Sequence, residues 1–350
     1  MPVYKRLLVY NWTNELSFLA VVLGFVAAHL GGAYLNKRLA LGWMASQLST
    51  LREQFFQVGF DSKVTNAADE SKLPWTSYLK KLGPIDYVFY ATGRLNIASL
   101  HGRFALKTRH NIIMLIFDYV FSFLATSPLP SDKLELTVTP AATYDNFIFA
   151  VVHKDSMKRV RETNYDISLT RTTDSAKLPV CFTVMSEAAE VTDTFFTPAL
   201  LAALANAQNV LEYLVLSDLP SERPSKPDDL LTSKKRAVLV LRVASSEQDK
   251  AATQALIGAF LGLLDVAVIK AHFRPEVSRK LKAVREEEVR KLKKMAEEER
   301  AEELAKQRAQ EKKAQKQSIS KLSPEEQKKA LQKEREKELR KQQKKMTRRN

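Results

Sequence analysis

The most regular apolar pattern in the chain is an uninterrupted stretch near its beginning. The twenty residues 16–35 contain no charged side chain, and His29 is their one strongly polar member. A helix of this length spans roughly 30 Å, which is the thickness of the hydrocarbon core of a bilayer. Trp12 and Tyr34 stand near the two ends, and such aromatic side chains favour the membrane interface. The pattern predicts a transmembrane helix over residues 16–35.

A cleaved signal peptide is the competing interpretation of this stretch, with residues 31–33 (Gly-Gly-Ala) as the small-residue cleavage site. Glu15 and a lead of fifteen residues are atypical of signal peptides, and the apolar run is longer than their hydrophobic region. We therefore expect an anchor that follows a short lumenal lead, residues 1–15. Basic residues flank the helix on both sides and do not fix its orientation: Lys5, Arg6, Lys37 and Arg38.

Three further apolar stretches are predicted to be core helices and not membrane spans: residues 112–125, 199–216 and 255–269. Each contains polar residues, and the uninterrupted runs are too short to cross a bilayer. Asp118 interrupts the first stretch and Asp265 the third. We expect one spanning segment.

Residues 39–274 show the pattern of a mixed α/β body. Leu134, Leu136 and Val138 alternate with polar neighbours, and further strands are predicted where β-branched and aromatic residues gather, at 146–152, 180–184 and 237–243. Helices are expected at 154–162, after Pro198 and after Ser245. Strands and helices grouped in this way favour the α+β class over a doubly wound sheet.

The last part of the chain, residues 275–350, is predicted to be a charged helical arm. It is rich in Glu, Lys, Arg, Gln and Ala and contains no glycine, so helix propensity and ion pairs one turn apart support a long helix. A heptad seam fails after Met295, which favours a single solvent-exposed helix over a coiled coil. A bend is expected near residues 318–323, because Ser323 and Pro324 have the pattern of a new helix start.

Charge is concentrated in this arm. The chain has 55 Lys and Arg against 40 Asp and Glu, and residues 279–350 alone hold 26 of the basic and 14 of the acidic side chains. A nearly neutral body with a basic arm indicates a polyanionic partner such as RNA or an anionic membrane surface. The candidate contacts are six basic residues without an acidic neighbour: Arg340, Lys341, Lys344, Lys345, Arg348 and Arg349.

A secondary basic cluster lies in the body and comprises Arg103, Lys107, Arg109 and His110. It is interpreted either as a solvated face or as a phosphate contact with RNA or lipid headgroups.

The sequence offers no catalytic, metal or cofactor site. Phosphate-binding glycine loops, nucleophile elbows and zinc-protease motifs are missing, and the five histidines are scattered. Cys181 is the one cysteine, which excludes an internal disulfide and fits a reducing compartment. It is predicted to be a buried structural thiol. We expect a protein that is not an enzyme.

Four local strings, taken with the order of anchor, body and arm, resemble the calumin family of coiled-coil-domain endoplasmic reticulum (ER) membrane proteins. They are Gly93-Arg94 opening a helix that ends at 107–110, residues 144–151 (Tyr-Asp-Asn-Phe-Ile-Phe-Ala-Val), residues 186–193 (Ser-Glu-Ala-Ala-Glu-Val-Thr-Asp), and residues 234–236 (Lys-Lys-Arg) entering a strand. The string at 186–193 is the most specific of them.

This resemblance implies a subunit of the PAT complex, in the ER membrane beside the Sec61 translocon under a translating ribosome. The implied partners are a small multi-spanning subunit like Asterix, ribosomal RNA near the tunnel exit, and nascent multi-pass membrane proteins whose insertion and folding are assisted. The body would be cytosolic. The family's acidic lumenal segment, associated with calcium binding, has no counterpart in residues 1–15, so calcium binding is not implied.

A second class of function fits the same anchor and arm. A membrane-anchored tether that binds RNA or anionic lipid, without a role in protein biogenesis, requires only these two parts.

Overall fold

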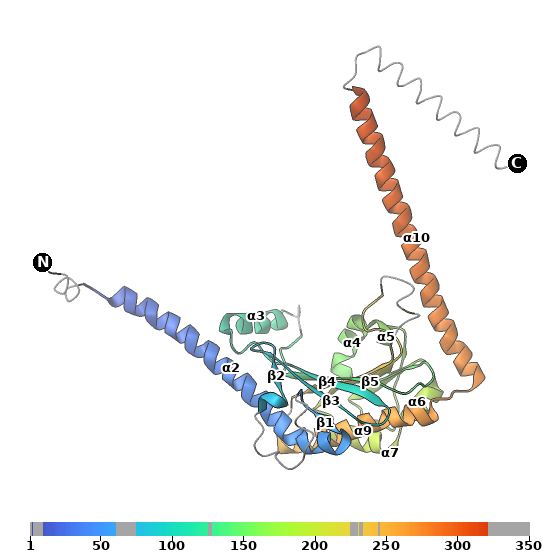
Figure 1. The fold of residues 1–350 in the computed structure, drawn as a ribbon, viewed down its shortest axis with the longest axis horizontal. Helices are drawn as coiled ribbons and strands as arrows, with labels where there is room; N and C mark the ends of the chain where they lie inside the picture. Colours follow the sequence, from blue (N-terminus) through green and yellow to red (C-terminus); the bar gives the residue numbers. More distant parts are fainter. Residues whose placement is uncertain are drawn as a thin grey trace. The chain divides into compact units, whose positions relative to one another are not determined.

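The structure is a computed structural model that describes residues 10–60, 75–124, 128–224, 234–243 and 246–320, together with residues 2 and 230. One compact unit extends from the N-terminal helix through Arg285, apart from residues 225–227, and a second unit holds the chain from Glu286 onward. Figure 1 shows the elements of the first unit, in which helices lie on both faces of a broad sheet.

The body is built on one antiparallel sheet. Its strands, as far as the chain is described, are β1 (Gln57–Val58), β2 (Lys80–Lys81), β3 (Asp86–Thr92), β4 (Ile97–Ala105), β5 (Lys133–Pro140), β6 (Ile148–His153), β7 (Arg171–Thr173), β8 (Phe182–Ser186), β9 (Leu211–Ser217) and β10 (Arg236–Arg242). The strand order is β1-β3-β4-β5-β10-β9-β6-β8-β7, and β2 pairs with β3 outside this path. An antiparallel sheet with helices in separate groups is the α+β class that the sequence predicts.

Helices connect and cover these strands. They are α2 (Thr13–Gln54), α3 (Ile112–Phe123), α4 (Met157–Thr163), α5 (Tyr165–Ser168), α6 (Ala189–Phe195), α7 (Pro198–Asn206), α9 (Glu247–Lys270) and α10 (Pro275–Ser320), with short 3-10 turns at Trp75–Ser77 and Lys154–Ser156.

The sheet carries a core on each face. The larger one contains Trp43 of α2, Phe260 of α9, and Phe89 and Phe104 of the sheet. On the other face, Val160 of α4 and Ile167 of α5 pack with valines of the sheet such as Val152 and Val240. Burial on both faces explains why β6, β9 and β10 have nearly continuous apolar sequences.

Helix α2 combines two environments in one continuous element of 42 residues. The predicted span 16–35 lies in its first part, where the most apolar window is only 6% buried. Further along the same helix, Ala40, Trp43, Met44 and Leu51 are buried in the core of the body. The apolar segment is therefore joined to the body by unbroken helix and not by a linker.

Helix α9 is also long and apolar enough to cross a membrane, but half of its apolar window is buried inside the molecule. Leu256, Phe260 and Leu264 pack into the core of the body. The predicted core helix at 255–269 is confirmed, with Ser246 as its N-cap.

Four predicted strands are confirmed as β5, β6, β8 and β10. The third begins later than expected, at Phe182, and Val180 before it is 87% exposed. The predicted helix at 154–162 is present as the turn at 154–156 followed by α4.

Two helix predictions were wrong. The stretch 199–216 is helical only as far as Asn206, and its second half is the buried strand β9. The expected helix between Gly93 and residues 107–110 is strand β4, which follows a tight turn with positive φ at Gly93 and Asn96. Asp265 of α9 fixes this turn, since its carboxylate accepts hydrogen bonds from Arg94 at 2.8 Å and Asn96 at 3.0 Å.

The C-terminal arm is helical from Pro275 to Ser320 as α10. The predicted restart at Ser323 and most of the expected bend at 318–323 lie outside the described residues.

Candidate functional site

The first part of α2 presents apolar side chains to its surroundings all the way round. Residues such as Phe18, Leu23, Phe25 and Leu30 are between about half and three-quarters exposed. A helix that is hydrophobic on every side is stable only in an apolar environment, such as a protein core or a bilayer. The body does not cover this part of α2.

Helix α3 has its polarity inverted relative to a surface helix in water. Its half-buried residues are Leu115, Asp118 and Ser122, and the remaining side chains are exposed although nearly all are apolar. Asp118 faces the protein and accepts a hydrogen bond of 2.7 Å from the Thr108 hydroxyl. Phe117 and Phe121 point outward and stack on each other. The helix at 112–125 exists as predicted, but its expected place in the core was wrong.

This inversion has a physical explanation that sequence pattern alone does not reveal. Asp118 was interpreted as a polar break in a buried helix, whereas the structure uses it to attach the helix to the body. The sequence held part of the signal, because Asp118 and Ser122 lie one turn apart on a single face. Which surroundings that face contacts is decided by the folded body.

The loop before α3 is pressed against α2. A side-chain carbon at Gly32 would clash with the backbone of Arg109 and His110, whereas Gly31 has open space at the same position. The rings of His29 and His110 meet edge to face with centroids 5.4 Å apart. Two histidines that are far apart in the sequence thus lie side by side.

A buried polar knot holds this loop to the end of the exposed segment of α2. The Asn36 amide, fully buried, donates to the carbonyl oxygens of Pro84 at 3.1 Å and Lys107 at 3.0 Å and accepts from Arg109 at 2.9 Å. Arg109 in turn donates to both carboxylate oxygens of Asp132 at 2.6 Å. Such a bidentate pair is strong and directional, so it fixes the loop and α3 relative to α2.

The electrostatics of the knot favour an ionised Asp132. Burial acts to raise the pKa of this carboxyl, but the hydrogen bonds from Arg109 and from the Lys107 backbone amide, with the charge of Arg109, bring its pKa below the ordinary value. The pair is therefore charged at neutral pH.

The residues of the predicted secondary basic cluster have separate contacts. Arg103 is on β4 and pairs with Asp86 at 3.0 Å, while Arg109 belongs to the knot. Lys107 donates to the Tyr119 hydroxyl at 3.3 Å, and His110 packs on His29. Lys107, Arg109 and His110 share one loop, whereas Arg103 is directed to a different partner. The six arm residues from Arg340 to Arg349 lie outside the described residues.

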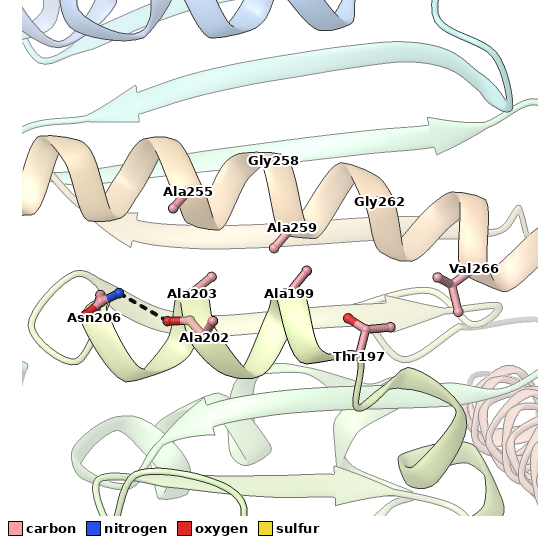
Figure 2. Close-up of a pocket in the computed structure, with 10 residues that line it drawn as sticks. All are labelled: Thr197, Ala199, Ala202, Ala203, Asn206, Ala255, Gly258, Ala259, Gly262 and Val266. Atoms are coloured by element: carbon pink, nitrogen blue, oxygen red, sulfur yellow. Dashed lines mark hydrogen bonds between the residues drawn. The ribbon is translucent and has the colours of Figure 1, made fainter.

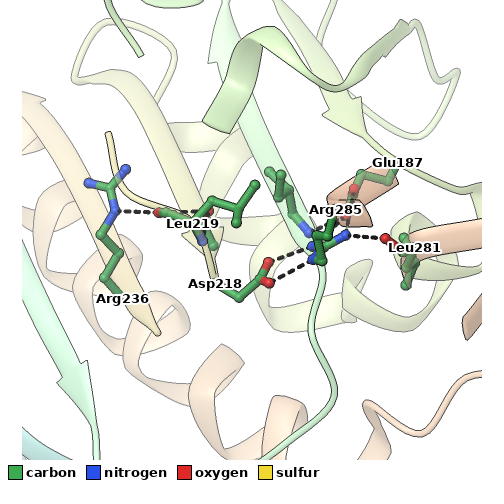
Figure 3. Close-up of polar contacts among 8 residues, drawn as sticks. Glu187, Asp218, Leu219, Arg236, Leu281 and Arg285 are labelled. Atoms are coloured by element: carbon green, nitrogen blue, oxygen red, sulfur yellow. Dashed lines mark hydrogen bonds and ion pairs between the residues drawn. The ribbon is translucent and has the colours of Figure 1, made fainter. Parts of the chain in front are cut away.

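A buried ion-pair cluster fixes the beginning of α10 to the body (Figure 3). Arg285 donates to Glu187 at 2.9 and 3.0 Å and to Asp218 at 2.5 and 2.7 Å. All three side chains are at most 14% exposed. Burial raises the pKa of Glu187, and the bonds from Arg285 oppose that rise. Glu187 belongs to the string 186–193 that resembles the calumin family, so this residue of the string has a structural role in the ion-pair cluster.

A shallow groove of about 420 Å³ lies between α7 and α9 (Figure 2). Small side chains line it, including Ala199, Ala203 and Ala259, and Gly258 and Gly262 have open space where a side chain would begin. The groove offers an apolar concave surface without charged groups.

Nothing in the described part of the chain has the geometry of a metal site, since no group of three or more His, Cys, Asp or Glu side chains converges there. Cys181 precedes β8 and is half-buried, not within the strand, and burial raises the pKa of its thiol.

Comparison with known proteins identifies the family. The model of the family described as PAT complex subunit CCDC47 matches residues 11–341. The chain belongs to the CCDC47 family. The match covers the apolar helix, the body and nearly all of the arm, as the resemblance in the sequence implied.

Two relatives of the CCDC47-family chain are named UPF0674 endoplasmic reticulum membrane proteins. The one from Schizosaccharomyces pombe is 29% identical over 71% of this chain and 67% of its own length. The one from Saccharomyces cerevisiae is 26% identical over 76% of this chain and 69% of its own length. A crystal structure of the mycobacterial trehalose monomycolate transport factor A, TtfA, aligns over 65% of this chain and 96% of that chain, with a TM-score of 0.27 and 9% identity.

Proposed function

We propose that this protein is an adaptor subunit of the ER membrane that binds ribosomes beside the Sec61 translocon and assists the insertion and folding of multi-pass membrane proteins. The observation that carries the proposal is the outward-facing apolar surface of one folded unit, formed by the first part of α2 and by α3. Family membership supports the PAT-complex assembly, with an Asterix-like small multi-spanning subunit as partner.

In this proposal α2 crosses the bilayer once, and α3 lies in the plane of the membrane interface. A helix with outward apolar residues and an inward Asp118 is unfavourable in water but favourable at the level of lipid headgroups and acyl chains. The knot at Asn36 would then lie where α2 leaves the hydrocarbon. Lys37 and Arg38 follow it directly, which suits a negatively charged cytosolic leaflet.

The arm supplies the ribosome contact in this proposal. Each Lys or Arg that neutralises an RNA phosphate releases a counterion, so binding weakens with a log–log salt slope of about −0.7 to −0.9 per contact. The six residues from Arg340 to Arg349 are the first candidates. The cluster at Arg285 gives the arm a fixed starting point on the body.

The test is co-sedimentation of the purified full chain with ribosomes over a range of salt concentrations. Three chains are compared: the natural one, one with the six arm residues changed to Glu, and one that ends at Met295. The end at Met295 retains Arg285, because the buried carboxylates of Glu187 and Asp218 both accept hydrogen bonds from its guanidinium. We expect salt-sensitive binding by the natural chain and loss of binding in both variants.

Equal sedimentation of all three chains at physiological salt would exclude the part of the arm beyond Met295 from the ribosome contact. If no chain sediments but all bind vesicles with anionic lipid, the protein is a lipid tether and the adaptor proposal fails.

A further inference from the structure

A cleft of about 430 Å³ opens where α2 passes from its exposed part into the body. Its wall on α2 is a single stripe, because Leu35, Arg38, Leu39 and Gly42 are spaced three and four residues apart and therefore share one helix face. Trp43 of α2, Arg109 of the knot and Lys250 of α9 complete the lining. Basic residues from three different elements thus line one cleft.

The cleft is chemically divided along the direction of α2. Leu35 belongs to the exposed apolar segment and is half exposed, whereas Arg38 follows one turn later. Leu39 and the buried Trp43 give the cleft an apolar floor. An occupant with a hydrocarbon part beside Leu35 and an anionic part beside Arg38 matches this order.

The three basic residues of the cleft differ in their acidic partners. Arg109 is paired with Asp132 in bidentate geometry. Lys250 pairs with Glu247, but that carboxylate is 88% exposed. Because solvent screens such a pair, Glu247 neutralises the charge of Lys250 only weakly. Arg38 is exposed and has no acidic partner among the described residues. The cleft therefore retains positive charge, and most of it is at Arg38.

We propose that this cleft binds the phosphodiester headgroup of an anionic phospholipid from the leaflet that faces the body. Arg38 and Lys250 contact the headgroup, and the acyl chains run along Leu35 toward the apolar segment of α2. The inference rests on the proposed crossing of the bilayer by α2. The cleft would then be a binding site for a single lipid molecule, in addition to the general contact between α2 and the membrane.

The test measures lipid binding to the full chain in non-ionic detergent by native mass spectrometry, during titration with dioleoyl phosphatidylserine or dioleoyl phosphatidylcholine. The informative variant is Arg38→Gln. Lys37→Gln is its matched control, because Lys37 is the adjacent exposed cation and does not line the cleft. Neither substitution removes a contact that the described structure uses for folding.

We expect one phosphatidylserine to bind tightly to the natural chain, with no comparable binding of phosphatidylcholine. Arg38→Gln should raise the half-saturating lipid concentration about fivefold. Lys250→Gln should act in the same direction, and Lys37→Gln should leave the concentration within about twofold.

Three results would overturn the inference. Equal binding of the two lipids removes the anionic selectivity, and equal loss in the Arg38 and Lys37 variants indicates diffuse surface charge. Competition by soluble glycerophosphoserine as strong as by the intact lipid indicates a site for free anions. Ribosome co-sedimentation of the Arg38→Gln chain tests the adaptor function separately, because the arm is unchanged in it.

Discussion

Gly32 is the residue at which the loop before α3 comes closest to α2. A helix normally gains stability from Ala in place of Gly, so the absence of a side chain here reflects close packing and not helix formation.

Replacing Gly32 by Ala should destabilise the protein, since the new carbon would meet the backbone of Arg109, which has no flexible end to move. We expect a loss of about 1–3 kcal/mol, measured as a lower apparent Tm of the full chain in detergent. Gly31→Ala is the matched control and should leave Tm unchanged or slightly higher. An equal effect of both changes would mean that the loop does not rest on α2.

The lowered pKa of Asp132 should make the stability of the protein depend on pH. Its folded pKa is below the ordinary value of 3.8, so the unfolded chain takes up its proton first as the pH falls. The stability that the Asp132–Arg109 pair contributes is therefore complete above about pH 4 to 5 and is lost as the pH falls through the folded pKa. Asp132→Asn should lower stability by about 2–3 kcal/mol at pH 7.

This pH dependence is checked by measuring the Tm of the natural and Asp132→Asn chains between pH 3 and 7. The difference in Tm should narrow toward acid. A difference that is constant or widens would show that the pair is not the source of the stability.

At the scale of elements, the sequence predicted some strands well and others not at all. The strands β5, β6 and β10 carry alternation or runs of β-branched residues, which identify a strand from local composition. The long hairpin of β3 and β4 was missed because its turn depends on Asp265 of α9, a contact that is distant in sequence. The polar knot was equally hidden, since Asn36, Arg109 and Asp132 share no spacing that local patterns detect.

For helix α3, the sequence pattern predicts the secondary structure but not the environment of the exposed face. Its helical state follows from the apolar run after the N-cap Asn111, but whether it faces a core or a membrane depends on what the body covers.

The membrane position of α3 is testable with a nitroxide on a single cysteine at Ile116, in a chain with Cys181→Ser reconstituted into vesicles. Ile116 is 57% exposed in the protein, so a label at the interface should collide with oxygen more than with a water-soluble nickel chelate. The control is a label at Leu95, which is 83% exposed on the β3–β4 turn and should favour the nickel chelate. Equal access of the chelate at both positions would place α3 in water.

Arg285 should be the side chain on which the beginning of α10 depends most. Arg285→Met removes the guanidinium to which the buried carboxylates of Glu187 and Asp218 are both bonded, which costs about 3–5 kcal/mol and should lower the apparent Tm by about 6–10 °C. Arg279→Met, at an exposed position of the same helix, should change Tm little. Arg285→Lys should give an intermediate value, because the ammonium keeps the charge but not the forked geometry. Equal Tm values for the Arg285→Met and Arg279→Met chains would contradict this.

At the scale of the whole molecule, three parts with different chemistry follow one another along the chain. An apolar helix continues into a body with a nearly neutral charge, and the body holds the first turns of a charged helix through Arg285. Family membership is consistent with this organisation. The order of an apolar helix, a mixed α and β body and a charged helix could be inferred from composition, since each part has its own. The outward face of α3 could not, because it depends on the folded body.

We propose that the apolar surface of α2 and α3 contacts membrane proteins during their synthesis. The most direct test of this proposal is photo-crosslinking from a reactive amino acid at Leu23 or Phe117 to nascent chains in ER membranes, with Leu95 as the control position. We predict crosslinks from Leu23 and Phe117 to nascent chains with several spans, and none to nascent soluble proteins. Crosslinks to lipid alone, with ribosome binding intact, would contradict the account and leave a membrane tether.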